Sequence, residues 1–402
     1  PLERGFNNYY IATAQGVITM NISQSVLRQP RSGIRRILEI AQKMSDVIHL
    51  EIGEPQFETP QHIVEAACRA LRSGDTKYTP NAGTDELRTA IANRVSKRIN
   101  RSISKENILV GVGGVEVINA TIRTICDAGD SILIPDPAWP NYQTMCTIAN
   151  ISPLCYSLTE KNSFRPDIQE LESLVNQETK ILIVNSPSNP LGIMFDKETL
   201  RDLYNFAEKH DLYILSDEAY EDITYDKKHV SPLTLDSAGT RVIGAYTMSK
   251  SYAMTGWRIG YVVADSNLID QMKKLQEAYV SSVPGALQHA ATVAIMGDQT
   301  CVDDMRKEYA AHRIVAMKIL DDAEMEYLAP NGAFYLWINV HTNDSTTFAE
   351  RFLQEKHVAV APGSAFGNWG QSYLRVSLAS STEEIAEGLT RLVDFCKSEQ
   401  RR

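Results

Sequence analysis

The sequence predicts an α/β fold: a large domain with a mostly parallel sheet between helices, and a smaller α+β domain after it. In the middle of the chain, short apolar runs alternate with segments whose apolar residues recur at helical spacing. This alternation is typical of a parallel sheet that helices cover on both faces. With 402 residues, of which 43% are hydrophobic, the chain is long enough to bury a large core and to form two or three domains.

The strands of the large sheet are predicted from apolar runs of four to six residues. These runs are Ile108–Gly111, Ser131–Pro135, Lys180–Asn185, Leu212–Ser216, Arg241–Tyr246 and Ile259–Ala264. Apolar residues at helical spacing over Val115–Ile125 predict a helix directly after the first strand. Asp196 is placed to cap a helix that runs to His210, because a carboxylate accepts from the free N–H groups of a first turn.

The C-terminal part has a different pattern. Three apolar runs, Phe334–Val340, Val358–Ala361 and Tyr373–Leu378, are predicted as strands of a smaller unit, and the helix predicted over Thr382–Lys397 packs on them. Val302–Asp321 is predicted as one long helix between the two parts. The change in pattern, rather than a linker, therefore places the division near residue 300.

We divide the chain into four parts on this basis. Residues 1–20 are predicted to be an N-terminal extension or tag, with Met20 as a candidate natural start. Residues 21–55 are predicted to join the small domain, residues 56–300 to form the large domain and residues 301–402 the small C-terminal domain. The first segment lacks the basic start and apolar stretch of a secretory signal.

Composition excludes several classes of function. Lys and Arg number 40 against 50 Asp and Glu, and this acidic balance argues against a nucleic-acid partner. No apolar run approaches the length that spans a bilayer, so no membrane partner is expected. The six cysteines form no CxxC pair and no cluster with zinc-ligand spacing. Reduced thiols in a cytoplasmic protein without a metal site are the expectation.

The densest chemical signal is the segment Thr247–Tyr261, TMSKSYAMTGWRIGY. In it, Lys250 lies among small hydroxyl residues directly after an apolar strand, and Arg258 follows eight positions later. A lysine at a strand end is partly desolvated, which lowers its pKa and frees the amine to attack a carbonyl. Hydroxyls and an arginine suit a phosphate. In isolation Lys250 would be assigned to the solvated surface, but this segment favours a catalytic role.

Three further segments follow predicted strands: Ser216–Tyr220 (SDEAY), Asn185–Gly192 (NSPSNPLG) and Gly111–Glu116 (GVGGVE). The first offers a carboxylate, either as a cap or as a partner for a cation. The second is either a proline-rich turn or part of a site. In the third, glycines allow backbone N–H groups to approach a phosphate at a helix start, although GxGG is not the dinucleotide fingerprint. Ligands of open α/β sheets bind beyond the carboxyl ends of the strands, so we expect all four segments to meet.

Together the four segments offer the groups that pyridoxal 5′-phosphate needs. From about Ser32 to the C-terminus, the sequence resembles the class I (fold type I) pyridoxal-phosphate aminotransferases of the aspartate aminotransferase superfamily. The run SKSYAMTGWRIGY is highly specific for that group. The resemblance implies a seven-stranded type of sheet in a pyridoxal-phosphate-binding large domain, pyridoxal 5′-phosphate as the cofactor, and a homodimer.

The resemblance also implies a role for each matching residue. Lys250 forms a Schiff base with the cofactor and then shuttles a proton, Asp217 pairs with the pyridinium nitrogen, and Tyr220 donates with Asn189 to the ring oxygen. The implied cofactor-binding residues are Gly113, Gly114, Val115, Trp139, Asn189, Asp217, Tyr220, Thr247, Lys250, Arg258 and, from the neighbouring subunit, Tyr78. The implied substrate-binding residues are Gly53, Asn189 and Arg375, of which Arg375 would clamp the α-carboxylate.

Two departures from the family pattern bear on the substrate. Leu191 replaces the usual threonine after the Asn-Pro pair and is expected to alter the pocket wall. Val115 stands where some aspartate-specific relatives have a lysine that reads the distal carboxylate. An acidic substrate would therefore need another cation. Arg35 is one candidate, and a solvated charge on a helix is the alternative role for it.

The leading hypothesis is an aminotransferase that moves an amino group from an L-amino acid to a 2-oxo acid, 2-oxoglutarate, by a ping-pong mechanism through Lys250. Aspartate-like, aromatic and alanine-type donors all stay open, since Ser281–Gly285 lies where relatives vary with substrate. One alternative is a β-lyase, decarboxylase, cyclase or oxidase on the same scaffold. The other is a regulator that keeps the fold, which the presence of Lys250 disfavours.

Overall fold

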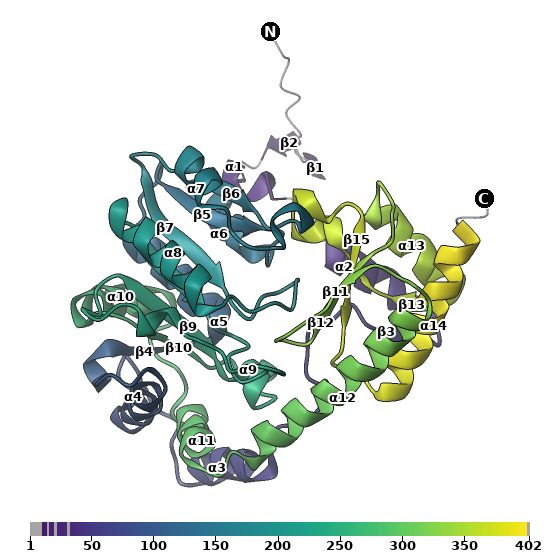
Figure 1. Ribbon diagram of the computed structural model, residues 1–402. Coiled ribbons are helices and arrows are strands. Elements are labelled where there is room, and N and C mark those ends of the chain that lie inside the picture. The colour runs from purple at the N-terminus through teal and green to yellow at the C-terminus, as the bar shows by residue number, and fades with distance from the viewer. Residues whose placement is uncertain (1–9, 14–15, 20–21, 30–32, 400–402) are drawn as a thin grey trace.

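The computed structural model describes residues 10–13, 16–19, 22–29 and 33–399 (Figure 1). Its largest sheet has seven strands in the order β4-β10-β9-β8-β7-β5-β6. Their bounds are Ile108–Gly111 (β4), Ser131–Asp136 (β5), Ser152–Ser157 (β6), Thr179–Asn185 (β7), Tyr213–Asp217 (β8), Val242–Thr247 (β9) and Gly260–Val263 (β10). Strands β6, β5, β7, β8 and β9 are parallel to one another, whereas β10 is antiparallel to both β4 and β9. The predicted α/β fold with a mostly parallel sheet is confirmed.

All six predicted strands of this sheet are present, within two residues at each end, and the seventh, β6, was missed. Its sequence, SPLCYS, contains a proline and two serines. Within the described chain β6 pairs with β5 alone, and Tyr156 is the one buried side chain of the strand. Because most of its side chains are at least partly exposed, this edge strand has no continuous apolar run, and the sequence pattern did not identify it.

Alternate residues of the central strands enter two different cores. On β7, Ile181 and Ile183 belong to the core on one face, whereas Leu182 and Val184 belong to the core on the other. Successive side chains of a strand point to opposite faces, so a sheet covered on both faces needs an unbroken apolar run. This is the physical reason why these strands could be recognised from short apolar runs.

Besides the single turn α9 (Met248–Ser251), eight α-helices of the described chain belong to the part that carries this sheet, and α5 and α8 were predicted. Their bounds are Gln61–Arg72 (α3), Asp85–Ile99 (α4), Gly113–Ile125 (α5), Asn141–Ala149 (α6), Ile168–Leu174 (α7), Lys197–Lys209 (α8), Ser266–Tyr279 (α10) and Gly285–Met296 (α11). Asp196 caps α8 as expected, because its carboxylate accepts from the N–H of Thr199 at 2.9 Å.

The C-terminal part has its own antiparallel sheet, in the order β11-β12-β15-β14. Its elements are α12 (Thr300–Asp322), β11 (Tyr327–Leu328), β12 (Tyr335–Asn339), α13 (Ser345–Lys356), β14 (Ala361–Pro362), β15 (Tyr373–Ser377) and α14 (Thr382–Glu399). The long helix α12 runs from beside α11 to α14, and so bridges the two parts as predicted (Figure 1).

The run predicted as one strand over Val358–Ala361 is in fact two strands. Its first half, β13 (Val358–Ala359), pairs in parallel with β3 (Ile48–His49), and β14 joins the antiparallel sheet. Helix α2 (Gly33–Ala41) and Leu50 share their core with the C-terminal elements. From α2 to Leu50 the N-terminal segment therefore packs on the C-terminal part, whereas α1 (Gln24–Leu27) contacts α6 of the other part. The assignment of residues 21–55 and the other domain boundaries stay a proposal.

The predicted extension, residues 1–20, is described only in part. Strands β1 (Tyr10–Thr13) and β2 (Gly16–Thr19) pair antiparallel, and α1 (Gln24–Leu27) follows them. Residues 1–9, 14–15 and 20–21 lie outside the described residues, and Met20 is among them. None of the helices in the described part of the chain is long and apolar enough to cross a membrane.

Candidate active site

The four segments singled out in the sequence follow strands that run in the same direction. Strands β7, β8 and β9 are parallel, and β4 has their direction because β10 is antiparallel to both β4 and β9. The segments after Gly111, Asn185, Asp217 and Thr247 therefore leave the sheet at one edge. The prediction that they meet beyond the carboxyl ends of the strands is confirmed for the backbone.

Lys250 lies in α9 (Met248–Ser251), a single turn that begins where β9 ends. Its Nζ donates to the carbonyl oxygen of Gly53 at 2.7 Å. Burial lowers the pKa of Lys250 to about 8, and the charge of Glu54 opposes this shift. An appreciable fraction of the amine is therefore uncharged near neutral pH, which is the state that attacks a carbonyl carbon.

Asp217 is a buried carboxylate at the end of β8. It accepts from the Tyr142 hydroxyl at 2.5 Å and from the Ala219 N–H at 3.1 Å. Burial raises its pKa to about 6, against the hydrogen bond from Tyr142. A cation placed beside this carboxylate would lower its pKa again, so the position suits a protonated ring nitrogen.

Arg375, on β15, is a buried guanidinium, 3% exposed. Its Nη1 donates to Asn189 Oδ1 at 3.0 Å, and its Nη2 donates to the carbonyl oxygen of Glu51. The rings of Tyr335 and Phe366 stack on the guanidinium, with centroids at 4.4 and 4.8 Å. Both hydrogen-bond acceptors are neutral, and Nε has no partner among the described residues. A buried positive charge held in this way is suited to a carboxylate.

The start of α5 forms a cradle with residues from the Thr247–Tyr261 segment. Gly113 has φ +82°, and a Cβ there would lie 2.4 Å from Arg258 Nη2. A Cβ on Gly114 would lie 3.4 Å from Thr247 Cβ. Thr247 Oγ1 donates to Ser249 Oγ at 2.9 Å. First-turn N–H groups, two hydroxyls and a guanidinium thus converge, and this set of donors fits a phosphate.

Tyr142, in the first turn of α6, is hydrogen-bonded to Asp217, and Trp139 packs against Tyr142. Their rings meet edge to face, with centroids 5.3 Å apart, and Tyr142 carries the hydroxyl that donates to Asp217. Sequence reasoning selected Trp139 and missed Tyr142. In the run DPAWPNY, Tyr142 follows Trp139 by three positions, but Trp139 precedes α6 and no regular spacing relates the two.

Tyr335 is the other functional candidate that the sequence did not reveal. Its hydroxyl lies 2.8 Å from the hydroxyl of Tyr220. A Cβ on Gly53 would lie 2.0 Å from the Tyr335 hydroxyl, so Gly53 is required here by the close approach of this phenol. In the sequence Tyr335 is one residue of an apolar strand, β12, and its position beside Gly53 and Tyr220 depends on the contact between the two parts of the chain.

Three expected residues have exposed side chains. Tyr78 is 90% exposed, and the side chain of Val115 is exposed at the start of α5. Arg35 has an exposed side chain on α2. Leu191, which was expected to alter the pocket wall, is fully buried in the larger core.

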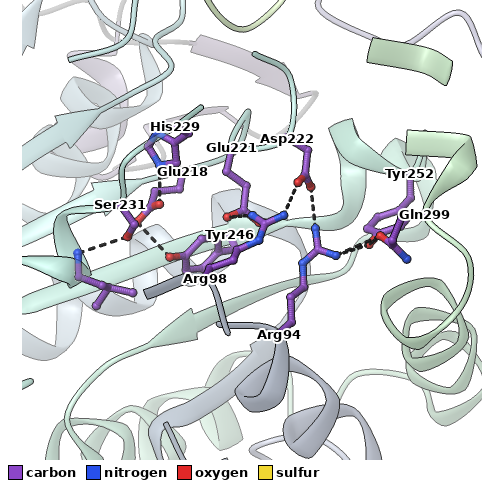
Figure 2. A network of polar contacts seen from close by, with 11 residues as sticks. Arg94, Arg98, Glu218, Glu221, Asp222, His229, Ser231, Tyr246, Tyr252 and Gln299 are labelled. Atoms are coloured by element: carbon purple, nitrogen blue, oxygen red, sulfur yellow. Dashed lines mark hydrogen bonds and ion pairs between the residues drawn. The ribbon is translucent and has the colours of Figure 1, made fainter. Parts of the chain in front are cut away.

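A network of ionic side chains, which the sequence analysis also missed, surrounds Asp222, and in it Arg98 is exposed while Arg94, Glu221 and Asp222 are partly buried (Figure 2). Asp222 accepts from Arg94 Nη2 at 2.8 Å and from Arg98, which also pairs with Glu221. Arg94 donates in addition to the Tyr252 hydroxyl, at 2.9 Å, and to Gln299. Tyr252 follows Lys250 by two positions and Asp222 follows Tyr220 by two, so the network joins the two chain segments that carry those residues to α4.

Glu218, next to Asp217, is fixed separately (Figure 2). Its carboxylate accepts from Ser231 Oγ at 2.7 Å and from the Tyr246 hydroxyl at 3.0 Å, and His229 Nε2 lies 2.7 Å away. Every oxygen of this buried carboxylate therefore has a partner. The side chains of Glu218, Glu221 and Asp222, which follow Asp217 in the chain, are thus anchored, and this restricts the movement of Asp217.

Comparison with known proteins identifies the family of the chain. The family model for aminotransferases of class I and II matches residues 45–392. An aspartate aminotransferase of Pyrococcus horikoshii is 38% identical over 385 residues, covering 94% of this chain and 98% of the relative. Aromatic-amino-acid aminotransferase 2 of Thermococcus litoralis is 36% identical, covering 92% of this chain and 96% of the relative. The structure of the Thermus thermophilus aspartate aminotransferase with maleate has a TM-score of 0.89 at 32% identity, covering 94% of this chain and all of that one.

The fold and the polar groups at the strand ends define an α/β protein with a buried amine, an anion cradle and a buried guanidinium. By the matches to its sequence and fold, the chain belongs to the family of class I and II aminotransferases, and it is a pyridoxal-phosphate-dependent aminotransferase of fold type I.

Proposed function

We propose that this chain transfers the amino group of an L-amino acid to 2-oxoglutarate by a ping-pong mechanism that uses Lys250. The observation that carries the proposal is that the lysine and the arginine are anchored on one short segment. Lys250 Nζ is bound to the carbonyl oxygen of Gly53, and Arg375 to that of Glu51, two residues earlier. An amino acid whose carboxylate meets Arg375 would therefore present its α-carbon near the Lys250 amine.

The residues present fit pyridoxal 5′-phosphate. Gly113, Gly114, the Val115 N–H, Thr247 and Arg258 would hold the phosphate in the cradle described above, and Asp217 would meet the ring nitrogen. Trp139 would stack on the ring, while Tyr220 and Asn189 would donate to its oxygen. When bound, the cofactor supplies an electrophilic carbonyl carbon and an electron-withdrawing ring.

Three side chains would then act on the substrate. Arg375 Nη1 and Nη2 would turn from Asn189 and Glu51 to the α-carboxylate and so fix the amino acid in one orientation. Asn189 would close on the same carboxylate. With its lowered pKa, Lys250 Nζ is suited to take a proton from the α-carbon and return it elsewhere, because a general base works best when its pKa is near the working pH.

We propose further that the active unit is a homodimer in which Tyr78 reaches the phosphate of the neighbouring site. The 90% exposure of Tyr78, a large aromatic side chain, supports this proposal, because such a residue gains most from an interface. We also propose a cytoplasmic location. The six cysteines, all free in the structure, support it.

The experiment that tests the function is an absorbance measurement with single amino acids. The purified chain, loaded with pyridoxal 5′-phosphate, is mixed in turn with aspartate, an aromatic amino acid and alanine, without an acceptor. We expect the cofactor band to bleach with one donor class and to return when 2-oxoglutarate is added, with glutamate as the product. The acceptor-dependent return distinguishes amino transfer from other chemistry on the scaffold.

A matched variant and a second product assay complete the test. The Lys250→Ala chain should neither bleach nor recover. Release of ammonia or carbon dioxide from an amino acid in the absence of 2-oxoglutarate would instead indicate a β-lyase or a decarboxylase, and would reject the proposed reaction.

A further inference from the structure

Glu116 places a buried carboxyl group directly beneath the proposed phosphate cradle. It lies in the first turn of α5, the helix whose first N–H groups would face the phosphate. Its side chain folds back toward β4, where Oε2 accepts from the N–H of Val112 at 3.1 Å. A Cβ on Gly111 would lie 2.0 Å from Oε2, so the absence of a side chain at Gly111 makes room for the carboxyl.

The other oxygen of this carboxyl, Oε1, is buried and has no hydrogen-bond partner among the described residues. Nearby, the amide of Gln276 donates to the carbonyl oxygen of Val110 and leaves its own buried oxygen without a donor. Near the end of β4, two buried acceptors therefore have no donor in the part of the chain that the structure describes. One added proton on Glu116 would remove a negative charge and convert an unpaired acceptor into a donor.

No cation is placed to neutralise Glu116 within the described part of the chain. The helix α5 packs on α6, α10, β4, β8, β9 and β10. The charged groups on these elements are Asp217 on β8 and Asp270, Lys273, Lys274 and Glu277 on α10, while Arg258 lies across Gly113. None of them takes part in the shift of Glu116: burial raises its pKa to about 7, and the Val112 hydrogen bond opposes that shift.

We propose that Glu116 takes up a proton when the phosphate of the cofactor binds in the cradle, so that cofactor binding and proton uptake are coupled. A phosphate monoester carries close to two negative charges at neutral pH, and a second anion at the same helix start would repel it. Only the neutral carboxyl is compatible with a tightly bound phosphate. Glu116 is therefore a positioning residue that sets how cofactor affinity depends on pH. This inference rests on the proposed binding of pyridoxal 5′-phosphate.

The test compares cofactor affinity in the full chain and in Glu116→Gln from pH 6 to pH 8. The glutamine keeps an oxygen for the Val112 N–H but cannot carry the charge. We expect the two dissociation constants for pyridoxal 5′-phosphate to be similar at pH 6, and that of the unaltered chain to be about tenfold larger at pH 8. The ratio isolates Glu116, because the ionisations of the cofactor and of Lys250 affect both proteins equally.

Glu106→Gln is the matched control, since it removes an exposed carboxylate at the other end of β4. Its ratio to the unaltered chain should stay near one at every pH. A ratio for Glu116→Gln that is equally flat would overturn the inference while leaving the proposed function intact. Failure of the unaltered chain to bind pyridoxal 5′-phosphate would reject the proposed function instead.

A calorimetric measurement keeps the inference testable if Glu116→Gln does not fold. In buffers of different ionisation enthalpy at pH 7.5, the unaltered chain should take up more protons with pyridoxal 5′-phosphate than with pyridoxal, which lacks the phosphate. We expect an excess of at least about half a proton per site. Equal proton counts for the two ligands would overturn the coupling.

Discussion

Burial, rather than a neighbouring charge, is the main cause of the lowered pKa of Lys250. The nearest acceptor is a neutral carbonyl, that of Gly53, which stabilises the ammonium only in part. Burial of the Lys250 amine therefore lowers the free energy of unfolding somewhat, and it also makes the amine more reactive. The same balance governs Asp217, whose burial disfavours its charged form until a cation binds beside it.

The first prediction concerns the pH dependence of cofactor capture by Lys250. The free amine is the nucleophile, so the rate at which the cofactor-free chain captures pyridoxal 5′-phosphate should rise about tenfold between pH 7 and pH 9 and then level off. Stopped-flow absorbance measures this rate. With Nα-acetyl-lysine as the reference amine, the rise should continue above pH 10. A chain whose rate also rises beyond pH 10 would show that Lys250 is an ordinary lysine.

The second prediction concerns the free energy of unfolding of the cofactor-free chain. Asp217 has a pKa of about 6 when folded and about 3.8 when unfolded, so the folded chain binds the proton more tightly. Its contribution to stability is present below pH 4 and is lost as the pH rises to 6. Asp217→Asn removes this dependence. Relative to the unaltered chain, the variant should gain about 2 to 3 kcal/mol between pH 4 and pH 6.5.

Urea unfolding at the two pH values measures this difference. The exposed residue Asp304 provides a control, because Asp304→Asn should show the same stability difference at both values. If Asp217→Asn behaved as this control does, Asp217 would not be the buried acid that the structure describes.

At the scale of elements, the network around Asp222 connects α4 with the segments after β8 and β9. Arg94 and Asp222 have side chains only 14% and 11% exposed. Charged residues in a helix and a loop are usually solvated, so the sequence offered no sign that these would be buried against one another. The burial arises from the packing of segments that lie far apart in the chain. It therefore cannot be predicted from a local sequence pattern.

The third prediction follows from that burial. Asp222→Ala leaves Arg94 and Arg98 without a shared partner, and should lower the free energy of unfolding by about 3 to 5 kcal/mol. The exposed pair Lys307–Asp304, with side chains 70% and 61% exposed, is the comparison, and Asp304→Ala should cost less than about 0.5 kcal/mol. Denaturant unfolding of both variants measures the contrast, and equal losses would contradict it.

The elements that sequence patterns identified are those whose local chemistry determines them. Strands β7 and β8 are buried on both faces and have unbroken apolar runs, and α8 begins at a capping aspartate. The elements that were missed or merged depend on distant partners. β6 is a half-exposed edge strand, and β13 is divided from β14 because it pairs with β3, some 310 residues earlier in the chain.

At the scale of the whole molecule, the candidate site draws on both parts of the chain. Residues at strand ends, such as Lys250 and Asp217, could be selected from the sequence because the carboxyl ends of parallel strands meet at one edge. Tyr335 could not, because its contact with Tyr220 requires the C-terminal sheet to be placed against the larger one. Arg375 was identified through the family resemblance alone, and its bond to Glu51 likewise joins distant segments.

The fourth prediction tests the proposed dimer. If Tyr78 of one subunit completes the site of the other, Tyr78→Ala and Lys250→Ala chains should each have little activity alone. Mixed in equal amounts after unfolding and refolding, they should recover about a quarter of the unaltered activity, because half of the dimers are mixed and each has one intact site. The amino-transfer assay described above measures the recovery. Activity no higher than the mean of the two single variants would reject a shared site.

The order of strands in the large sheet has a consequence for folding during translation. β4 is the first strand of that sheet to be synthesised, yet within the sheet it pairs with β10. Gly111 therefore cannot pair until Gly260 has been synthesised. At about 5 to 20 residues per second, this delay lasts roughly 7 to 30 seconds. During that time an apolar strand lacks its neighbour in the growing chain. In this interval nearby helices or chaperones have to cover β4. The pairing of β4 with β10 forms only late in translation.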